Sequence, residues 1–70
     1  MSLGEHIRKV RRERLAMTQL ELANALQTNP VNVSRWERGV AEPKLKYVRQ
    51  IAEIADLPVS WFFNGEERAA

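Results

Sequence analysis

Apolar residues recur at intervals of three or four positions along most of this chain, which is the spacing of one face of an α-helix. The first such stripe predicts an amphipathic helix over residues 3–15 and consists of Leu3, Ile7 and Val10. Ser2 and Glu5 stand three residues apart at its start, which predicts a capping box.

A second helix is predicted to begin after Thr18, a favourable N-cap that has Glu21 at the third helical position. Its inward stripe consists of Leu22, Ala23 and Leu26. Gln27-Thr28 then forms a tight turn, and a third helix follows with Asn29 as its cap.

The third helix opens with Pro30, because proline suits the first helical position. Val33 and Trp36 face inward on it, and Gly39 is expected to end it with a positive φ angle. A loop over residues 41–43 leads to a fourth helix. The inward stripe of that helix consists of Leu45, Val48, Ile51, Ala52 and Ala55.

Pro58 starts a short last helix over residues 59–63, and Asn64-Gly65 terminates it. The tail, residues 66–70, is expected to fray. No stretch alternates apolar and polar residues in the manner of a strand. The pattern therefore predicts an all-α domain over residues 1–65, a bundle of five short helices around one core.

Seventy residues are enough for one domain with a modest core. The chain has no Cys, and its one His, His6, has no partner at metal-ligand spacing, so we expect no disulfide, metal or cofactor. No apolar run approaches the ~20 residues that cross a bilayer, and no signal peptide is recognisable at the N-terminus. We therefore expect a cytoplasmic protein without a membrane span.

The net charge of +2 is small, but the charges are unevenly placed. Basic residues crowd the first helix, the third helix and the start of the fourth: Arg8, Lys9, Arg11, Arg12, Arg14, Arg35, Arg38, Lys44 and Lys46. Acidic residues gather toward the C-terminus: Glu53, Asp56, Glu66 and Glu67. This asymmetry fits a polyanion on one face, although most charge runs are simply solvated helix faces.

Residues 18–39 have the layout of a helix-turn-helix, with the small residue Ala23 where the two helices touch. Four apolar residues lock the two helices together: Leu22, Leu26, Val33 and Trp36. The positions that then point outward are Pro30, Val31, Asn32, Ser34, Arg35 and Arg38. A helix presented in this way can enter the major groove of DNA.

At these residues the chain resembles the phage repressor/Cro (XRE-like) family of helix-turn-helix regulators. The matching residues are Thr18-Gln19, Leu22-Ala23, Val33-Ser34-Arg35, Glu37, Gly39, Pro43, Ile51-Ala52, Leu57 and residues 59–65. The resemblance covers the chain from Gly4 to Gly65. It implies a lambda-repressor-like DNA-binding domain and a transcriptional regulator, a repressor above all, that binds double-stranded DNA.

The chain departs from the family pattern at two places. Gln27 occupies a turn position that is usually Gly, and a positive φ angle there costs about 1 kcal/mol. The link between the first two helices is one residue longer than usual. The family pairs an Arg of the first helix with the acid that Glu37 matches. We favour Arg11, on the edge of the core, over Arg12, which counting back from Thr18 would select.

Four outward residues of the third helix are candidates for reading bases: Arg35, Val31, Asn32 and Ser34. Arg35 can donate two hydrogen bonds to guanine, and Val31 can pack on a thymine methyl group. Asn32 can read adenine or hold a phosphate, and the small Ser34 lets the helix approach closely. The plainer alternatives are a phosphate contact for Arg35 and partial burial for Val31.

Five residues are candidates for binding backbone phosphates: Gln19, Asn29, Arg38, Lys44 and Lys46. Gln19 opens the second helix, where its backbone N–H and its side chain can clamp a phosphate. Pro30 offers no polar group, so fewer base pairs are read near the start of the third helix.

The aromatic residues are assigned by their helical spacing. Trp36 and Phe62 belong to the core, and Trp61 or Phe63 is left partly exposed. In the family that this chain resembles, the C-terminal helix often contributes to a dimer contact. We therefore expect a homodimer, at least on DNA, that presents two recognition helices ~34 Å apart to a near-palindromic operator.

Other classes of function fit these residues less well. A protein-interaction adaptor with the same fold would not need Gln19, Arg35 and Arg38 on the outward face. An antitoxin or a restriction-modification controller remains open within the DNA-binding class. An enzyme is disfavoured because Ser34 and Ser60 lack a general base at recognisable spacing, and no glycine-rich phosphate loop is present. No small-molecule ligand is expected.

Overall fold

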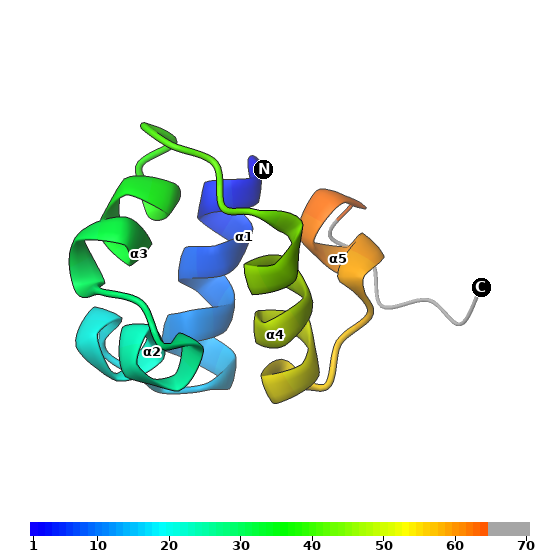
Figure 1. The fold of residues 1–70 in the computed structure, drawn as a ribbon. Coiled ribbons are helices and arrows are strands. Elements are labelled where there is room, and N and C mark those ends of the chain that lie inside the picture. Colours follow the sequence, from blue (N-terminus) through cyan, green and yellow to red (C-terminus); the bar gives the residue numbers. More distant parts are fainter. Residues whose placement is uncertain (65–70) are drawn as a thin grey trace.

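A computed structural model describes residues 1–64, and in this range the chain forms five α-helices, a π-helical turn and no β-strand (Figure 1). The helices are α1 (Leu3–Lys9), α2 (Gln19–Leu26), α3 (Pro30–Glu37), α4 (Leu45–Ala55) and α5 (Val59–Asn64). The all-α fold with five helices is thus confirmed. The predictions for Gly65 and for the tail over residues 66–70 lie outside the described residues.

The helix starts follow the predicted local chemistry. Ser2 and Glu5 form a capping box in which each side chain accepts a hydrogen bond from the backbone N–H of the other residue. Thr18 and Glu21 form a second one at the start of α2. Asn29 caps α3 by accepting a backbone N–H at 2.9 Å. The cap residues and the first turns of these three helices were therefore predicted correctly.

The first predicted helix is not α-helical throughout. After α1 the chain continues as a π-helical turn, η1 (Val10–Arg14), and the backbone N–H of Leu15 donates to the carbonyl of Val10 at 2.9 Å. A π turn holds more residues than an α turn, so it accommodates the additional residue in the link between the first two helices. Ala16 then reverses the chain with a φ angle of 52°.

The turn between α2 and α3 is built on a left-handed residue. Gln27 has φ 57° and ψ 43°, so the expected strain of a non-glycine residue is present at this position. Asp56 ends α4 in the same conformation. Gly39 follows α3 with a φ angle of 73°, as predicted.

The core lies between the helices and contains the predicted stripes. Its buried apolar residues are Ile7, Val10, Leu22, Ala23, Leu26, Val33, Trp36, Val48, Ile51, Ala52, Ala55, Leu57, Trp61 and Phe62. Leu45 was wrongly included in the stripe of α4, because its side chain is 50% exposed. It lies about 70° around the helix from the centre of the stripe, which leaves it at the solvent edge.

The N-terminal turn of α1 packs directly on the end of α3. A Cβ atom added to Gly4 would lie 2.2 Å from the carbonyl oxygen of Trp36 and 2.9 Å from that of Glu37. Only glycine permits this approach, so Gly4 fixes the distance between the two helices.

The last helix is held against α1 by a buried hydrogen bond. His6 Nδ1 lies 2.7 Å from the carbonyl oxygen of Phe62. Phe62 and Trp61 are buried, whereas Phe63 is 55% exposed, so Phe63 is the exposed member of the predicted pair. None of the helices described is long and apolar enough to cross a membrane.

Candidate nucleic-acid interface

The helix-turn-helix unit presents one face of α3 to solvent and fixes the other. Val33 and Trp36 are buried against the core, together with Ala23 of α2. On the opposite side, Val31 is 58% exposed and Arg35 is also exposed. The burial of one face therefore determines which side chains of α3 another molecule can reach.

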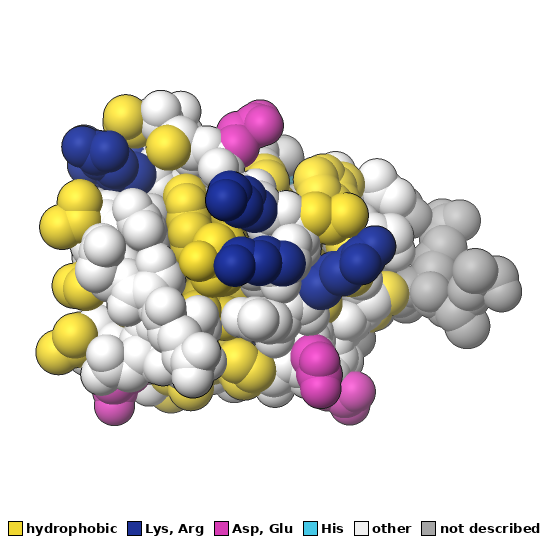
Figure 2. Space-filling model, in the orientation of Figure 1, with side chains coloured by type: hydrophobic (Ala, Val, Ile, Leu, Met, Phe, Trp, Pro, Cys, Tyr) yellow, Lys and Arg dark blue, Asp and Glu magenta, His cyan; other side chains and the backbone are white. Residues whose placement is uncertain are grey.

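Basic side chains collect beside this helix. Figure 2 shows Lys and Arg side chains over the end of α3, over the α3–α4 connection and over the first half of α4. Acidic side chains in the same view lie toward the end of α4, at the top of the molecule and at its lower left edge, outside the basic group over α4. This face therefore carries a positive band beside the exposed surface of α3, which suits a polyanionic ligand.

Ser34 and Arg38 of α3 are joined to each other. Arg38 Nε donates to Ser34 Oγ at 3.3 Å, one helical turn away. The hydroxyl group of Ser34 thus steadies the Arg38 side chain. Arg38 keeps further N–H donors for an external acceptor, because a guanidinium carries five.

Asn32 is also held from within the turn. Its Nδ2 donates to Thr28 Oγ1 at 2.9 Å, and its backbone N–H donates to Asn29 Oδ1 at 2.9 Å. The bond to Thr28 fixes the orientation of the Asn32 side-chain amide before any ligand arrives. Thr28 was not singled out from the sequence, although its position four residues before Asn32 is a spacing at which side chains meet. The Asn29 side chain acts as a cap through Oδ1, which leaves its Nδ2 group to donate to a ligand.

An ion pair links η1 to α3 and to the residues just before α2. Arg11 Nε lies 2.6 Å from Glu37 Oε2, and Arg11 Nη2 lies 3.0 Å from Glu37 Oε1. Arg11 Nη1 also donates to the carbonyl of Met17 at 2.9 Å. The structure therefore pairs Arg11, and not Arg12, with Glu37.

Gln19 belongs to the same network. Its Nε2 donates to Glu37 Oε1 at 3.1 Å, so the side chain is turned toward the protein. The backbone N–H of Gln19 lies in the first turn of α2, where helical N–H groups have no partner within the helix. That N–H group, rather than the whole side chain, is the feature of Gln19 best placed for an anion.

Lys44 and Lys46 lie at the start of α4, after the connection that follows α3. Lys44 occupies the N-cap position of α4 and is exposed, with no side-chain capping bond. Lys46 Nζ lies 4.9 Å from the centre of the Tyr47 ring. The Tyr47 ring is in turn 5.2 Å from that of Trp36, so this stack connects the start of α4 to α3. Tyr47 was not predicted, because nothing in its local sequence indicates the contact.

Among the described residues, no group of three His, Asp or Glu side chains could hold a metal ion. The side chains described above offer hydrogen bonding, positive charge and apolar contact. These are the three means by which proteins bind DNA bases and phosphates.

Comparison with known proteins gives concordant results. A family model described as helix-turn-helix matches residues 7–62. The HTH-type transcriptional regulator DicA of Escherichia coli is 39% identical over 67 residues, which cover 96% of this chain and 49% of DicA. The chain thus spans about half the length of this curated relative.

Two solved structures have a similar fold. The P22 c2 repressor in complex with a synthetic operator has a TM-score of 0.80 and 26% identity, over 94% of this chain and 98% of that one. The DNA-binding domain of the P22 c2 repressor in solution has a TM-score of 0.81 and 24% identity, over 100% of this chain and 91% of that one.

Proposed function

This chain belongs to the phage repressor/Cro-like helix-turn-helix family, and on that premise we propose that it is a sequence-specific DNA-binding transcriptional regulator that acts as a repressor. The observation that carries the proposal is the exposed face of α3, which holds Val31 and Arg35 outward while Val33 and Trp36 are buried. In this proposal α3 enters the major groove of the operator.

Four side chains of α3 read the bases. Arg35 donates to O6 and N7 of a guanine, and Val31 packs on the methyl group of a thymine. Asn32, which Thr28 holds in place, presents its remaining amide groups to an adenine. Ser34 is small enough to let the helix approach the base edges.

Five residues position the protein on the backbone. The candidates are Gln19, Asn29, Arg38, Lys44 and Lys46. Gln19 acts through the N–H groups at the start of α2, where the helix dipole favours an anion. Arg38 and Lys44 hold phosphates on the two sides of α3, and Lys46 adds charge beside Lys44. These contacts supply affinity for any sequence and make it dependent on salt.

The Arg11–Glu37 pair has a structural role in this proposal. It is largely withdrawn from solvent and holds the start of α2 at a fixed place beside α3. The protein acts by binding and not by catalysis. We assign the DNA-binding unit to residues 1–65, with the helix-turn-helix at residues 18–39, and place the protein in the cytoplasm.

We further infer that the operator is near-palindromic and is bound by a homodimer. A single short recognition helix contacts few base pairs, and a two-fold dimer doubles the site with half-sites ~34 Å apart. The exposed Phe63 on α5 offers apolar surface for such a contact.

The test is selection of binding sites from random duplex DNA, followed by titration of the selected sequence at two salt concentrations. We expect an enriched near-palindromic motif whose affinity falls as salt rises. An Arg35→Ala protein, carried through the same selection as a control, should lose the preference at one position of each half-site. If the folded wild-type protein enriches no sequence even at low salt, the proposal is wrong and an interaction adaptor takes its place.

A further inference from the structure

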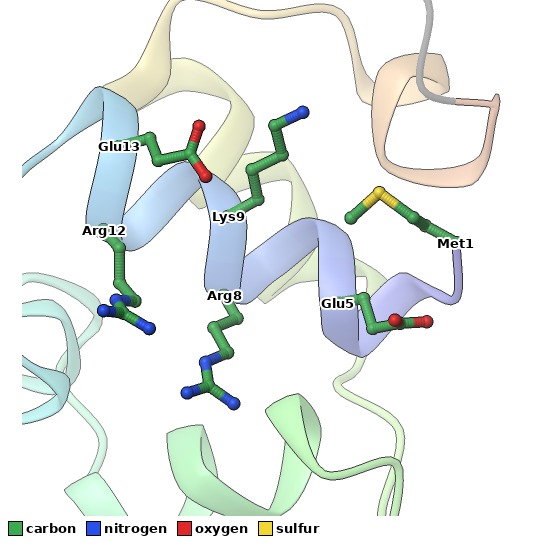
Figure 3. Close-up of a pocket in the computed structure, with 6 residues that line it drawn as sticks. All are labelled: Met1, Glu5, Arg8, Lys9, Arg12 and Glu13. Atoms are coloured by element: carbon green, nitrogen blue, oxygen red, sulfur yellow. The ribbon is translucent and has the colours of Figure 1, made fainter.

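The outer surface of α1 and η1 carries basic side chains that the proposed recognition surface does not use. Arg8, Lys9 and Arg12 line a shallow, open depression with Met1, Glu5 and Glu13. Figure 3 shows Arg8 and Arg12 pointing together toward the α3 side of the helix, whereas Lys9 and Glu13 point toward α5. The two arginines therefore form one group, and Lys9 does not belong to it.

The arginine pair follows the edge of the contact between α1 and α3. Gly4 marks that contact, because its α-carbon faces the carbonyl groups at the end of α3. Arg8 follows Gly4 by four residues of α-helix, which places both on one side of α1, with Arg8 rotated by about 40° from the α3 contact. Arg12 lies in the π turn η1, and its side chain points to the same side as that of Arg8, so the two arginines form a row (Figure 3).

The end of this row lies close to the start of α2. Arg11, the neighbour of Arg12 in the chain, binds Glu37 and the carbonyl of Met17, two residues before α2 begins. Gln19 joins the same network through its side chain. Arg12 therefore lies near the N–H groups that we propose as a phosphate clamp.

The row also faces the same side of the molecule as the outer surface of α3. α1 and α3 run in opposite directions in Figure 1 and pack where Gly4 meets the end of α3, and Arg11 of η1 contacts Glu37 of α3. On α3, Ser34 and the C-cap residue Arg38 lie next to Glu37 on the solvent side. Arg8 of α1 and Arg12 of η1 lie next to Arg11 of η1. Because antiparallel neighbours share one solvent-facing side, these residues border the same surface.

No carboxylate of the described residues pairs with either arginine. The carboxylate of Glu37 is occupied by Arg11, and that of Glu5 accepts the backbone N–H of Ser2 at 2.9 Å. Within residues 1–64, neither Arg8 nor Arg12 forms an ion pair, and both are exposed. Two free guanidinium groups one turn apart are suited to phosphate oxygens, which they can bind in a bidentate manner.

We propose that Arg8 and Arg12 form a second phosphate-binding site, which contacts the DNA backbone beyond the start of α2. This inference rests on the proposed function, because it requires α3 to lie in the major groove. Lys44 holds the backbone on the α4 side of α3, and the arginine pair holds it on the α1 side. The protein then contacts phosphates outside the base pairs that α3 reads.

The test compares three substitutions on one helix: Arg8→Gln, Arg12→Gln and, as the matched control, Lys9→Gln. Each removes one positive charge from an exposed position, so the net charge of the three variants is equal. Affinity for the selected operator is titrated over a series of salt concentrations. The slope of log K against log salt is negative. We expect its magnitude to fall by about 0.9 in each arginine variant and by about 1.8 in the double arginine variant.

Lys9→Gln should leave the slope close to that of the wild type, and ethylation interference should show flanking phosphates whose contact is lost only in the arginine variants. An equal effect of Lys9→Gln, or an unchanged slope in the double variant, would overturn the assignment. Thermal unfolding of all variants should coincide, since the replaced side chains are exposed. A wild-type protein that binds no duplex would instead refute the proposed function itself.

Discussion

The guanidinium group of Arg11 meets the carboxylate of Glu37 in a two-pronged contact, with Nε 2.6 Å from Oε2 and Nη2 3.0 Å from Oε1. This pair connects the π turn after α1 to the last turn of α3, and Gln19 attaches the start of α2 to it. The proposed reading helix and the proposed phosphate clamp therefore depend on one carboxylate for their relative position.

Loss of the Arg11 side chain should destabilise the fold. The two side chains are only 11% and 3% exposed, so Arg11→Ala leaves the Glu37 carboxylate buried with the neutral Gln19 side chain in place of a charged partner. We expect the free energy of unfolding to fall by about 3 kcal/mol, measured by urea denaturation. Arg12→Ala is the control and should cost less than about 0.5 kcal/mol, because Arg12 is exposed. Equal losses in the two variants would contradict the structural role of the pair.

Arg35 and Lys44 should differ in what they contribute to DNA binding. Arg35→Ala should weaken binding by roughly 1–3 kcal/mol and relax the preference at one base position. Lys44→Ala should weaken binding to all sequences alike and reduce the salt slope by about one unit. Titrations of both variants against the selected operator and against random duplex separate the two effects. If each variant weakens specific and random binding equally, the assigned roles are wrong.

The left-handed turn residue offers a route to higher stability. Gln27 has a φ angle of 57°, and Gln27→Gly removes the clash of its Cβ atom. We expect a gain of up to about 1 kcal/mol in the free energy of unfolding, reduced by the greater freedom of glycine in the unfolded chain. Ala25→Gly, within α2 and also exposed, should instead lose about 1 kcal/mol. Denaturant titration of both proteins shows whether each substitution raises or lowers the free energy of unfolding.

Gly4 should tolerate no side chain. Gly4→Ala places a methyl group 2.2 Å from the carbonyl oxygen of Trp36, so α1 must move away from α3. We expect a loss of roughly 1–3 kcal/mol or more, seen as a lower thermal midpoint. Gly39→Ala is the comparison, since the space around Gly39 is open and only its φ angle of 73° opposes a side chain. A smaller effect at Gly4 than at Gly39 would argue against the close packing of the two helices.

The capping box at the start of α1 should respond to acid. The backbone N–H of Ser2 donates to the Glu5 carboxylate and, with the Ser2 side chain, lowers the pKa of Glu5. Because the folded pKa is the lower one, this stabilisation is complete above the ordinary pKa of Glu and is lost as the pH falls through the folded pKa. Glu5→Gln keeps an acceptor that does not titrate. The stability advantage of the wild type over Glu5→Gln should therefore shrink on acidification, measured by thermal unfolding at a series of pH values.

The sequence by itself determined the helices and their starts. Thr18 with Glu21, and Asn29 before Pro30, are signals completed within four residues, so the chain forms them wherever the helix lies. The burial of Val33 and Trp36 was also predictable, because apolar residues at helical spacing share one face and that face packs against the core. The start of α3 and the position of its apolar stripe together predicted which face of α3 points outward.

The tertiary structure decided the contacts that the local pattern left open or missed. It selected Arg11 over Arg12 as the partner of Glu37, turned the Gln19 side chain inward and left Leu45 in solvent. Caps and stripes are encoded by neighbours in the chain, but a partner on another helix depends on how far each helix is rotated about its axis. Here the π turn η1 sets that rotation for the arginines after α1, and periodicity alone cannot reveal it.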